Sequence, residues 1–411
     1  MKLALLLVCL LFGVIVFLTL DGFRTAAMHR LAASRLSTCA VRDPVRDHAL
    51  KPNCASMMQW GGDPYEFHTN SLGFRDEKIR EVPLADPHPR ILMLGTSFTQ
   101  GEIAWRDSYV GRIAAHFAQY DFLNGGVAIY SPSNYLNTAR MVLAKGVDID
   151  EVIVFIDISD VQDEAAYYRD VDTSGTVTGP EREDWILPGY AKWRFRVSQH
   201  LALTNRVFGF VERIRVGHGH YQLTTGPFGD AFDGERSAWT YRKVNETDPF
   251  IAGYAPLGAE GGIAKEKAKM TLLWQELKER DIPISVVVGP WPAQIAHDTA
   301  DSKQVLIWRD WCEGKCKRFI SLFPAFLAVK DHCPRGQPGC WYVSLFIFGD
   351  VHYNAAGNAL VVDALIKSFA EQPPNKHALH VSSPSPGVPR QIGRDGTSHP
   401  KIMSASQSKS D

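Results

Sequence analysis

The sequence lacks an excess of charge of either sign. Its 411 residues include 44 Lys and Arg against 45 Asp and Glu, so the chain has no basic character that would attract phosphates. Nucleic acid is therefore not expected as a partner. The sequence also lacks an internal repeat, and 45% hydrophobic with 22% charged residues is an ordinary globular composition. This length suffices for one large domain or two ordinary ones.

Charge is also missing from the start of the chain. Residues 3–20 form an apolar run of 18 residues without a charged side chain. That run is about long enough to cross a bilayer core and longer than most signal-peptide cores. We expect a transmembrane anchor over residues 1–24, with the membrane as a partner and the rest of the chain exported to the periplasm or the cell exterior. A cleaved signal peptide is the alternative, although no small-x-small cleavage site directly follows Leu20.

The cysteines lack the C-x2-C spacing that is typical of zinc knuckles. Three, sixteen and six residues separate the last four of them, and we expect neither a metal site nor another cofactor. Disulfides suit an exported domain better. Apart from Cys9 in the expected anchor, the cysteines are Cys39, Cys54, Cys312, Cys316, Cys333 and Cys340. We expect the pairs 39–54 and 333–340, with 312–316 as a strained or alternative pair, while spacing leaves other connectivities open.

An alternation of apolar strands and amphipathic helices begins near residue 90. Strands that are separated by single helices favour right-handed crossovers and a parallel sheet, so the sequence predicts an α/β fold. We expect a juxtamembrane and lead-in segment over 25–85 and one main domain over 86–372 with an insertion at about 161–260. Residues 373–411 contain six prolines and eight serines with almost no apolar clustering, which predicts a disordered tail.

Polar side chains follow the strands at the edge where sites form in parallel sheets. Ser97 follows the first strand, residues 124–130 follow the second, and residues 157–160 follow the third. Asp350 and His352 precede the last helix. A serine hydroxyl needs an imidazole to take its proton, and the imidazole needs a carboxylate to hold its tautomer. The alternative is structural: a serine after a strand is often a turn or a helix cap, and the second segment can simply begin a helix with Asn354 as its cap.

Four segments, in this order, resemble the sequence blocks of the SGNH hydrolase superfamily, the GDSL-type esterases and acyltransferases. They are GTSFTQG at 95–101, NGGVAIYSP at 124–132, FIDISDVQDE at 155–164 and DVHYNAAG at 350–357. TNSLGFRD at 69–76 is also similar to a segment of bacterial envelope members. The resemblance implies a three-layer α/β/α fold, with Ser97 as nucleophile, His352 as base and Asp350 as its partner.

The sequence departs from that family around the oxyanion hole. Thr96 stands where the first block has aspartate, Ile129 where the second has glycine, and Ser159 where the third has asparagine. The resemblance implies three hydrogen-bond donors to the oxyanion. They are the backbone N–H groups of Ser97 and Ile129 and the side chain of Ser159. The G-T-S and D-x-H segments are similar to those of alginate O-acetyltransferases, although there the D-x-H pair precedes the serine.

The resulting prediction is a membrane-anchored, exported serine ester hydrolase or O-acyltransferase that acts on O-acetyl esters of envelope glycans or on small esters. Trp291 is expected either to line the site, where its ring face suits a sugar, or to pack in the core. The alternative prediction is a catalytically weak glycan-binding or assembly protein with the same fold, because Ile129 and Ser159 occupy positions where the family places donors.

Overall fold

A computed structural model of the whole chain describes residues 2–33, 39–58, 60, 65–172, 175–179, 230–242, 252–334, 337 and 339–376, with a few isolated positions between 201 and 211. The chain divides into a unit over Met1–Lys376 and a second over His377–Asp411. Most of the expected insertion and residues 377–411 of the expected tail lie outside the described residues.

The domain is built on one eight-stranded sheet with the strand order β12-β11-β8-β6-β7-β5-β4-β3. Its parallel half consists of β6 (Arg90–Leu94), β7 (Asp121–Asn124), β8 (Glu151–Ile156), β11 (Ile284–Val288) and β12 (Cys316–Ser321). The three central strands, β6, β8 and β11, are buried along their whole length and rich in Val, Ile and Leu because both of their faces are covered, whereas the edge strand β12 is only half-buried. The α/β prediction is confirmed, but the sheet is mixed rather than purely parallel.

The antiparallel half of the sheet comes from the segment that we expected to be only a lead-in. It consists of β3 (Ala55–Met58), β4 (Tyr65–Thr69) and β5 (Arg75–Asp76), and β5 joins β7 where Arg75 pairs with Asn124. The strands are only two to five residues long, too short for a clear alternation, and β5 finds its partner β7 about 50 residues further along the chain. Two small hairpins are separate, β1 (Ala40–Asp43) with β2 (Asp47–Leu50) and β9 (Arg169–Asp170) with β10 (Val177–Thr178).

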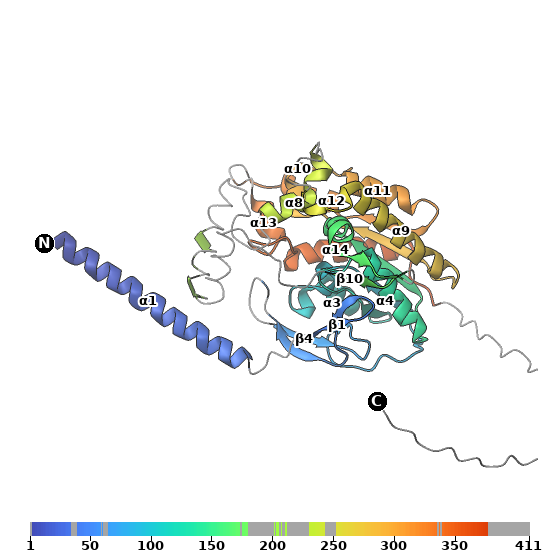
Figure 1. Cartoon of the computed structure of the whole chain (residues 1–411), viewed down its shortest axis with the longest axis horizontal. Helices are drawn as coiled ribbons and strands as arrows, with labels where there is room; N and C mark the ends of the chain where they lie inside the picture. Colours follow the sequence, from blue (N-terminus) through green and yellow to red (C-terminus); the bar gives the residue numbers. More distant parts are fainter. Residues whose placement is uncertain are drawn as a thin grey trace, which may run out of the picture. The chain divides into compact units, whose positions relative to one another are not determined.

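Helices cover both faces of the sheet (Figure 1). Alternate residues of β6 point to opposite faces, Ile91 and Met93 to one core and Leu92 and Leu94 to the other. The first core includes α3 (Tyr109–His116), α12 (Phe323–Asp331), α13 (Cys340–Leu345) and α14 (Ala355–Glu371), and the second includes α4 (Pro132–Ala144), α9 (Gly258–Lys278) and α11 (Lys303–Cys312). The expected three layers are therefore present.

The shorter elements lie mainly at the ends of the strands. They are α2 (Ser97–Gln100), α5 (Ser159–Gln162), α8 (Asp230–Tyr241) and α10 (Pro292–His297), with 3-10 turns at Trp105–Asp107 and Ala252–Tyr254 and a π-helical turn at Asp163–Tyr167. Of these, α2 and α5 follow β6 and β8 directly, so they place the first and third sequence blocks at the same edge of the sheet.

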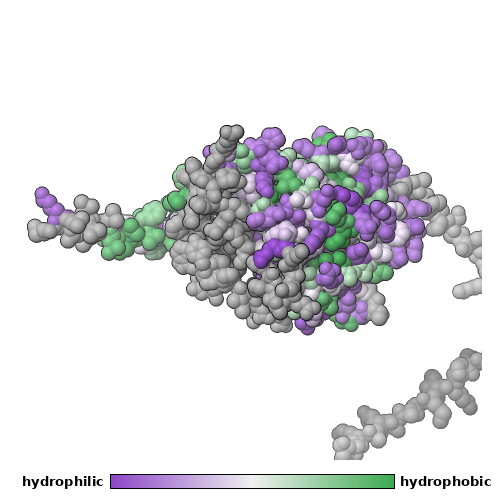
Figure 2. All heavy atoms as spheres, turned by 90° about the horizontal axis from the view of Figure 1, so that it is seen from above, coloured by the Kyte–Doolittle hydropathy of each residue, from purple (hydrophilic) through white to green (hydrophobic). Residues whose placement is uncertain are grey.

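The N-terminal run forms helix α1 (Lys2–Ala33). The part of α1 that is coloured in Figure 2 is mainly hydrophobic, and Leu11, Phe12 and Leu20 are more than half exposed. Among the described residues, no helix combines the length and the apolar character that crossing a membrane requires. This finding does not support the transmembrane anchor that we expected over residues 1–24.

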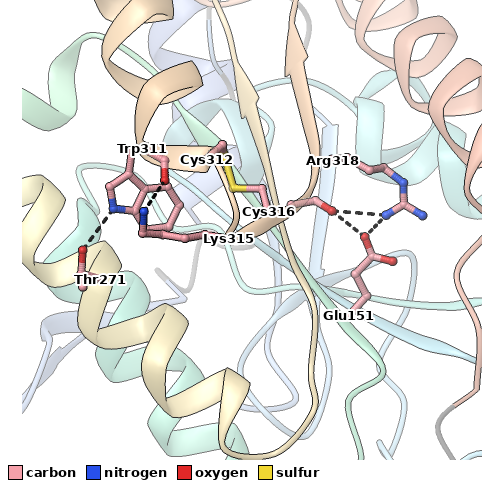
Figure 3. The surroundings of a disulfide bond; sticks show 8 residues. Glu151, Thr271, Trp311, Cys312, Lys315, Cys316 and Arg318 are labelled. Atoms are coloured by element: carbon pink, nitrogen blue, oxygen red, sulfur yellow. Dashed lines mark hydrogen bonds and ion pairs between the residues drawn. A yellow bond between two sulfur atoms is a disulfide. The ribbon is translucent and has the colours of Figure 1, made fainter.

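Three disulfides link neighbouring elements of the domain: Cys39–Cys54, Cys312–Cys316 and Cys333–Cys340. The two expected pairs are confirmed, and the third pair forms as well. Figure 3 shows that Cys312–Cys316 joins the end of α11 to the start of β12. Beside it, the indole N–H of Trp311 donates to the Thr271 hydroxyl at 3.1 Å, which fixes the helix against α9.

Replacing both cysteines of one pair by serine tests how much each bridge stabilises the domain. Loss of Cys39–Cys54 is expected to lower the free energy of unfolding by about 3 kcal/mol and loss of Cys312–Cys316 by about 2 kcal/mol, because the sequence separations are 15 and 4 residues. Denaturant unfolding of the two double variants measures both values. Equal losses, or six free thiols in protein from an oxidising compartment, would contradict this account.

Candidate functional site

Ser97 lies at the carboxyl end of β6, where it begins helix α2. The side chain of Thr96, not that of Ser97, caps this helix by accepting a hydrogen bond from Phe98 N at 3.3 Å. Ser97 is partly exposed, whereas Thr96 is buried. The capping role that we considered for the serine therefore belongs to its neighbour.

The structure brings Ser97, His352 and Asp350 together in one line of hydrogen bonds. His352 Nε2 lies 2.7 Å from Ser97 Oγ, and His352 Nδ1 lies 2.5 Å from Asp350 Oδ1. The backbone N–H of His352 also donates to Asp350 Oδ1 at 2.9 Å. Both Asp350 and His352 are more than 90% buried, whereas Ser97 is partly exposed.

The segment before α14 begins that helix, which is the structural role that we considered for it. Asn354 caps the helix, since its side chain accepts from Ala356 N at 2.9 Å and Gly357 N at 3.1 Å. The hydroxyl of Tyr342 fixes the preceding turn by accepting from Gly349 N and Asp350 N at 2.7 and 3.0 Å. Helix capping and turn geometry thus hold Asp350 and His352 in place.

Carboxylates surround the imidazole of His352. Burial by itself lowers the pKa of His352, but Asp350, Glu102 and Asp157 attract its proton and the net effect is a raised pKa. Glu102 is itself fully buried, which raises the pKa of its carboxyl. The site therefore favours the imidazolium that forms when the histidine takes a proton.

Ile129 adopts a backbone conformation that is typical of glycine. Its φ of +70° lies in the left-handed region, where a β-branched residue is rare. Three hydrogen bonds fix this turn: Gln100 Oε1 accepts from Ala128 N at 2.9 Å, His48 Nε2 contacts Ala128 O at 2.8 Å, and the Tyr168 hydroxyl donates to Ile129 O at 2.9 Å. The turn thus keeps the backbone orientation that glycine would give.

Ser159 does not direct its hydroxyl proton toward the nucleophile. Its Oγ and its N donate to Asp157 Oδ1 at 2.6 and 2.9 Å, and a carboxylate oxygen only accepts. The other oxygen, Asp157 Oδ2, accepts from Thr96 Oγ1 at 2.5 Å. Thr96 and Ser159, two of the departures from the family, are therefore linked through one buried carboxylate, and the structure does not support Ser159 as an oxyanion donor.

Trp291 packs in the core rather than lining an open site. It is 2% exposed, and its ring centroid lies 6.1 Å from that of Phe98. Phe98 in turn contacts the imidazole of His352 with 4.8 Å between ring centroids. Of the two alternatives for Trp291, the packing role agrees with the structure, because its side chain is buried against Phe98.

The sequence did not indicate two side chains near the triad, Trp60 and Glu102, because neither belongs to the four sequence blocks. The indole N–H of Trp60 donates to Asp350 Oδ2 at 2.7 Å. Glu102 accepts from Gln100 Nε2 at 3.0 Å and from the Tyr65 hydroxyl at 3.3 Å. In the part of the chain that the structure describes, no group of three or more His, Cys, Asp or Glu side chains is placed to hold a metal ion.

Comparison with known proteins gives distant likenesses only. No protein-family model and no curated protein matches the chain. A gut microbial diltiazem-metabolizing enzyme is similar at 10% identity and a TM-score of 0.37, over 70% of this chain and 49% of its own length. An acetyl-xylooligosaccharide esterase from Geobacillus is similar at 12% identity and a TM-score of 0.36, over 69% and 95% of the two chains.

A member of the lipolytic G-D-S-L family from Veillonella parvula is similar at 11% identity and a TM-score of 0.35, over 68% and 98% of the chains. Its name is that of the family whose blocks this sequence resembles. The chain spans about half the length of the diltiazem-metabolizing enzyme and nearly all of the other two. Because these likenesses are weak, the roles of individual residues depend on the geometry of the site.

An NMR titration of the His352 ring tests its electrostatic surroundings directly. We expect a pKa above the ordinary value of 6.5, and the Asp350→Asn variant should bring it below that value, because burial remains while the nearest negative charge is gone. A pKa that stays the same in Asp350→Asn would show that the carboxylate does not act on the imidazole.

Replacing Ile129 by glycine tests the strained turn. The free energy of unfolding is expected to hold or to rise by up to about 1 kcal/mol, because glycine adopts positive φ without a Cβ clash. Ala128→Gly is the matched control, and it should lower the value by roughly 0.5–1 kcal/mol by increasing the entropy of the unfolded chain. Denaturant unfolding of both variants gives the comparison. Equal losses would contradict the account of this turn.

Proposed function

We propose that the chain is an SGNH-type serine ester hydrolase or O-acyltransferase that works through an acyl-enzyme on Ser97. The observation that carries this proposal is the continuous line from Ser97 Oγ through His352 to Asp350, with distances of 2.7 and 2.5 Å. A turn or a cap requires no such line, and the cap of α2 is Thr96.

The geometry supports a two-step mechanism. In the first step Ser97 Oγ attacks the ester carbonyl carbon while His352 Nε2 takes the hydroxyl proton. The tetrahedral intermediate collapses, the bond to the alkoxide breaks, and Nε2 returns the proton to the leaving oxygen. In the second step His352 Nε2 takes a proton from water or from a sugar hydroxyl, whose oxygen attacks the acyl carbon. The bond between the acyl carbon and Ser97 Oγ then breaks, and Nε2 returns the proton to Oγ. Asp350 holds the Nδ1–H tautomer and stabilises the imidazolium in both steps.

Backbone N–H groups are the oxyanion donors in this proposal. They are those of Ser97 and Ile129, and each such donor is worth roughly 3–4 kcal/mol of the barrier. The left-handed conformation of Ile129 supports its role, because it preserves the backbone direction that the family obtains with glycine. Ser159 has no such role here, since its hydroxyl donates to Asp157.

The proposed substrate is an O-acetyl ester of an envelope glycan, and the proposed location is outside the cytoplasm. The likeness of the G-T-S and D-x-H segments to alginate O-acetyltransferases supports an acetyl group. Three disulfides support an oxidising compartment, because cytosolic thiols are kept reduced. Water and a sugar hydroxyl would enter the same acyl-enzyme, so hydrolysis and transfer differ only in the acceptor.

One observation favours a second candidate, a glycan-binding protein without turnover. The family's third block supplies a side-chain donor to the oxyanion, whereas here Ser159 donates to Asp157 instead. Two backbone donors without the third would leave the tetrahedral intermediate less stabilised. Turnover of a simple activated ester separates the two candidates.

The Ser97→Ala variant tests the nucleophile. It should abolish both labelling by a fluorophosphonate probe and turnover of p-nitrophenyl acetate, while the melting temperature stays near that of the wild type. His352→Ala should lose nearly as much turnover, because the members of a triad act as a unit. Activity assays and thermal unfolding on the same samples provide both readouts.

Ser108→Ala is the matched control for a structural serine. Ser108 caps α3 by accepting from Gly111 N at 3.1 Å, so its loss should cost about 1 kcal/mol of stability and leave labelling intact. A folded Ser97→Ala protein with full turnover would end the nucleophile hypothesis. Absence of labelling and turnover in the wild type would favour the binding protein.

A further inference from the structure

We propose that Trp60 is a positioning residue of the triad, supplied by the antiparallel half of the sheet. Its indole Nε1–H donates to Asp350 Oδ2 at 2.7 Å, although the two residues are 290 positions apart in the sequence. This inference rests on the proposed function, because it assigns Trp60 to the same reaction. Trp60 acts through Asp350 and His352.

The hydrogen bonds of Asp350 show what Trp60 adds. Oδ1 accepts both from the backbone N–H and from the ring Nδ1 of His352, while Oδ2 accepts from Trp60. Asp350 is only 7% exposed, and a buried carboxylate is costly unless both oxygens have donors. A donor on Oδ2 also fixes the plane of the carboxylate, which keeps Oδ1 directed at the imidazole.

The ring of Trp60 holds the imidazole as well. Its edge meets the His352 ring at 84°, with 5.4 Å between the centroids. Phe98, next to the nucleophile, contacts the same imidazole at 4.8 Å. Rotation of the histidine away from Ser97 would break these two ring contacts together with the hydrogen bond to Asp350.

The position of Trp60 gives the antiparallel strands a function. Trp60 follows β3 and precedes β4, whose Tyr65 donates to the buried Glu102. The Cys39–Cys54 disulfide ends one residue before β3. Strand pairing and a covalent bridge thus fix the segment from which Trp60 reaches the triad.

Loss of the indole N–H has an effect that is distinct from simple destabilisation. The charged groups that act on His352 are the carboxylates of Asp350, Glu102 and Asp157. The positive end of the indole dipole offsets part of the Asp350 charge, so removing it should strengthen the pull of Asp350 on the imidazole proton. The pKa of His352 should then rise, so the fall of kcat/KM at low pH should move to higher pH. In addition, a less firmly oriented carboxylate should lower kcat roughly tenfold.

The test compares Trp60→Phe, which keeps a ring but removes the donor, with Trp60→Gln. The glutamine Nε2 is the same number of bonds from Cβ as the indole Nε1 and can donate in its place. Trp274→Phe is the control, since Trp274 lies on α9 beside Lys278 and away from the triad. We would measure kcat and KM for p-nitrophenyl acetate across pH, together with the melting temperature.

Trp60→Phe should lose roughly tenfold in kcat with little change in KM and should show the shift to higher pH, while Trp60→Gln should recover part of both. A folded Trp60→Phe protein with the wild-type kcat and pH profile would overturn the inference. So would a loss of kcat in both variants that follows the melting temperature without any shift in pH.

The low-field NMR signal of the His352 Nδ1–H separates this inference from the proposed function, because it requires no turnover. If the wild type shows neither labelling nor turnover, the proposed function fails, and this signal still reports on the positioning. A shifted or lost signal in Trp60→Phe, restored in part by Trp60→Gln, supports the role of Trp60. An unchanged signal contradicts it.

Discussion

The hydrogen bond between Ser97 and His352 joins two segments that lie 255 positions apart in the chain, and the site exists only if the fold holds them together. The helices behind the triad provide this. Asn358 of α14 accepts from the backbone N–H of Tyr109 in α3 at 2.9 Å, and the Tyr109 hydroxyl donates to Thr99 of α2 at 2.8 Å. Buried hydrogen bonds thus connect the helix after His352 with the helix that begins at Ser97, so the packing of the helices and the contact between Ser97 and His352 depend on the same residues.

The departures from the family have physical consequences that partly compensate for one another. A threonine in place of the first-block aspartate becomes a donor, and Asp157 supplies the carboxylate that accepts from it. The same carboxylate accepts a hydrogen bond from the hydroxyl of Ser159. Ile129, by contrast, keeps the turn at the cost of backbone strain, because a side chain at positive φ is unfavourable. In the proposed mechanism this arrangement keeps Ser97 and two backbone donors and lacks a side-chain donor.

Much of the site could be predicted because parallel strands bring their carboxyl ends to one edge. Ser97 and Asp157 follow buried apolar strands, and the apolar runs of these strands are recognisable in the amino-acid sequence. Trp60 could not be found, because Asp350 lies 290 positions away and the antiparallel strands on either side of Trp60 are too short to show a periodic pattern. The direction of the Ser159 hydroxyl and the burial of Trp291 likewise follow from tertiary packing, which periodicity does not encode.

The central claim is that Ser97 becomes acylated. Mass spectrometry of the intact protein after brief exposure to an activated acetyl ester tests it most directly, with peptide mapping to locate the adduct and candidate oligosaccharides added as acceptors. The account predicts one acetyl group on Ser97 and none on Ser97→Ala. The acetyl group on Ser97 should be lost by hydrolysis with time, or by transfer when a suitable sugar is added. A stable adduct elsewhere, or no adduct under conditions in which the ester remains intact, would contradict it.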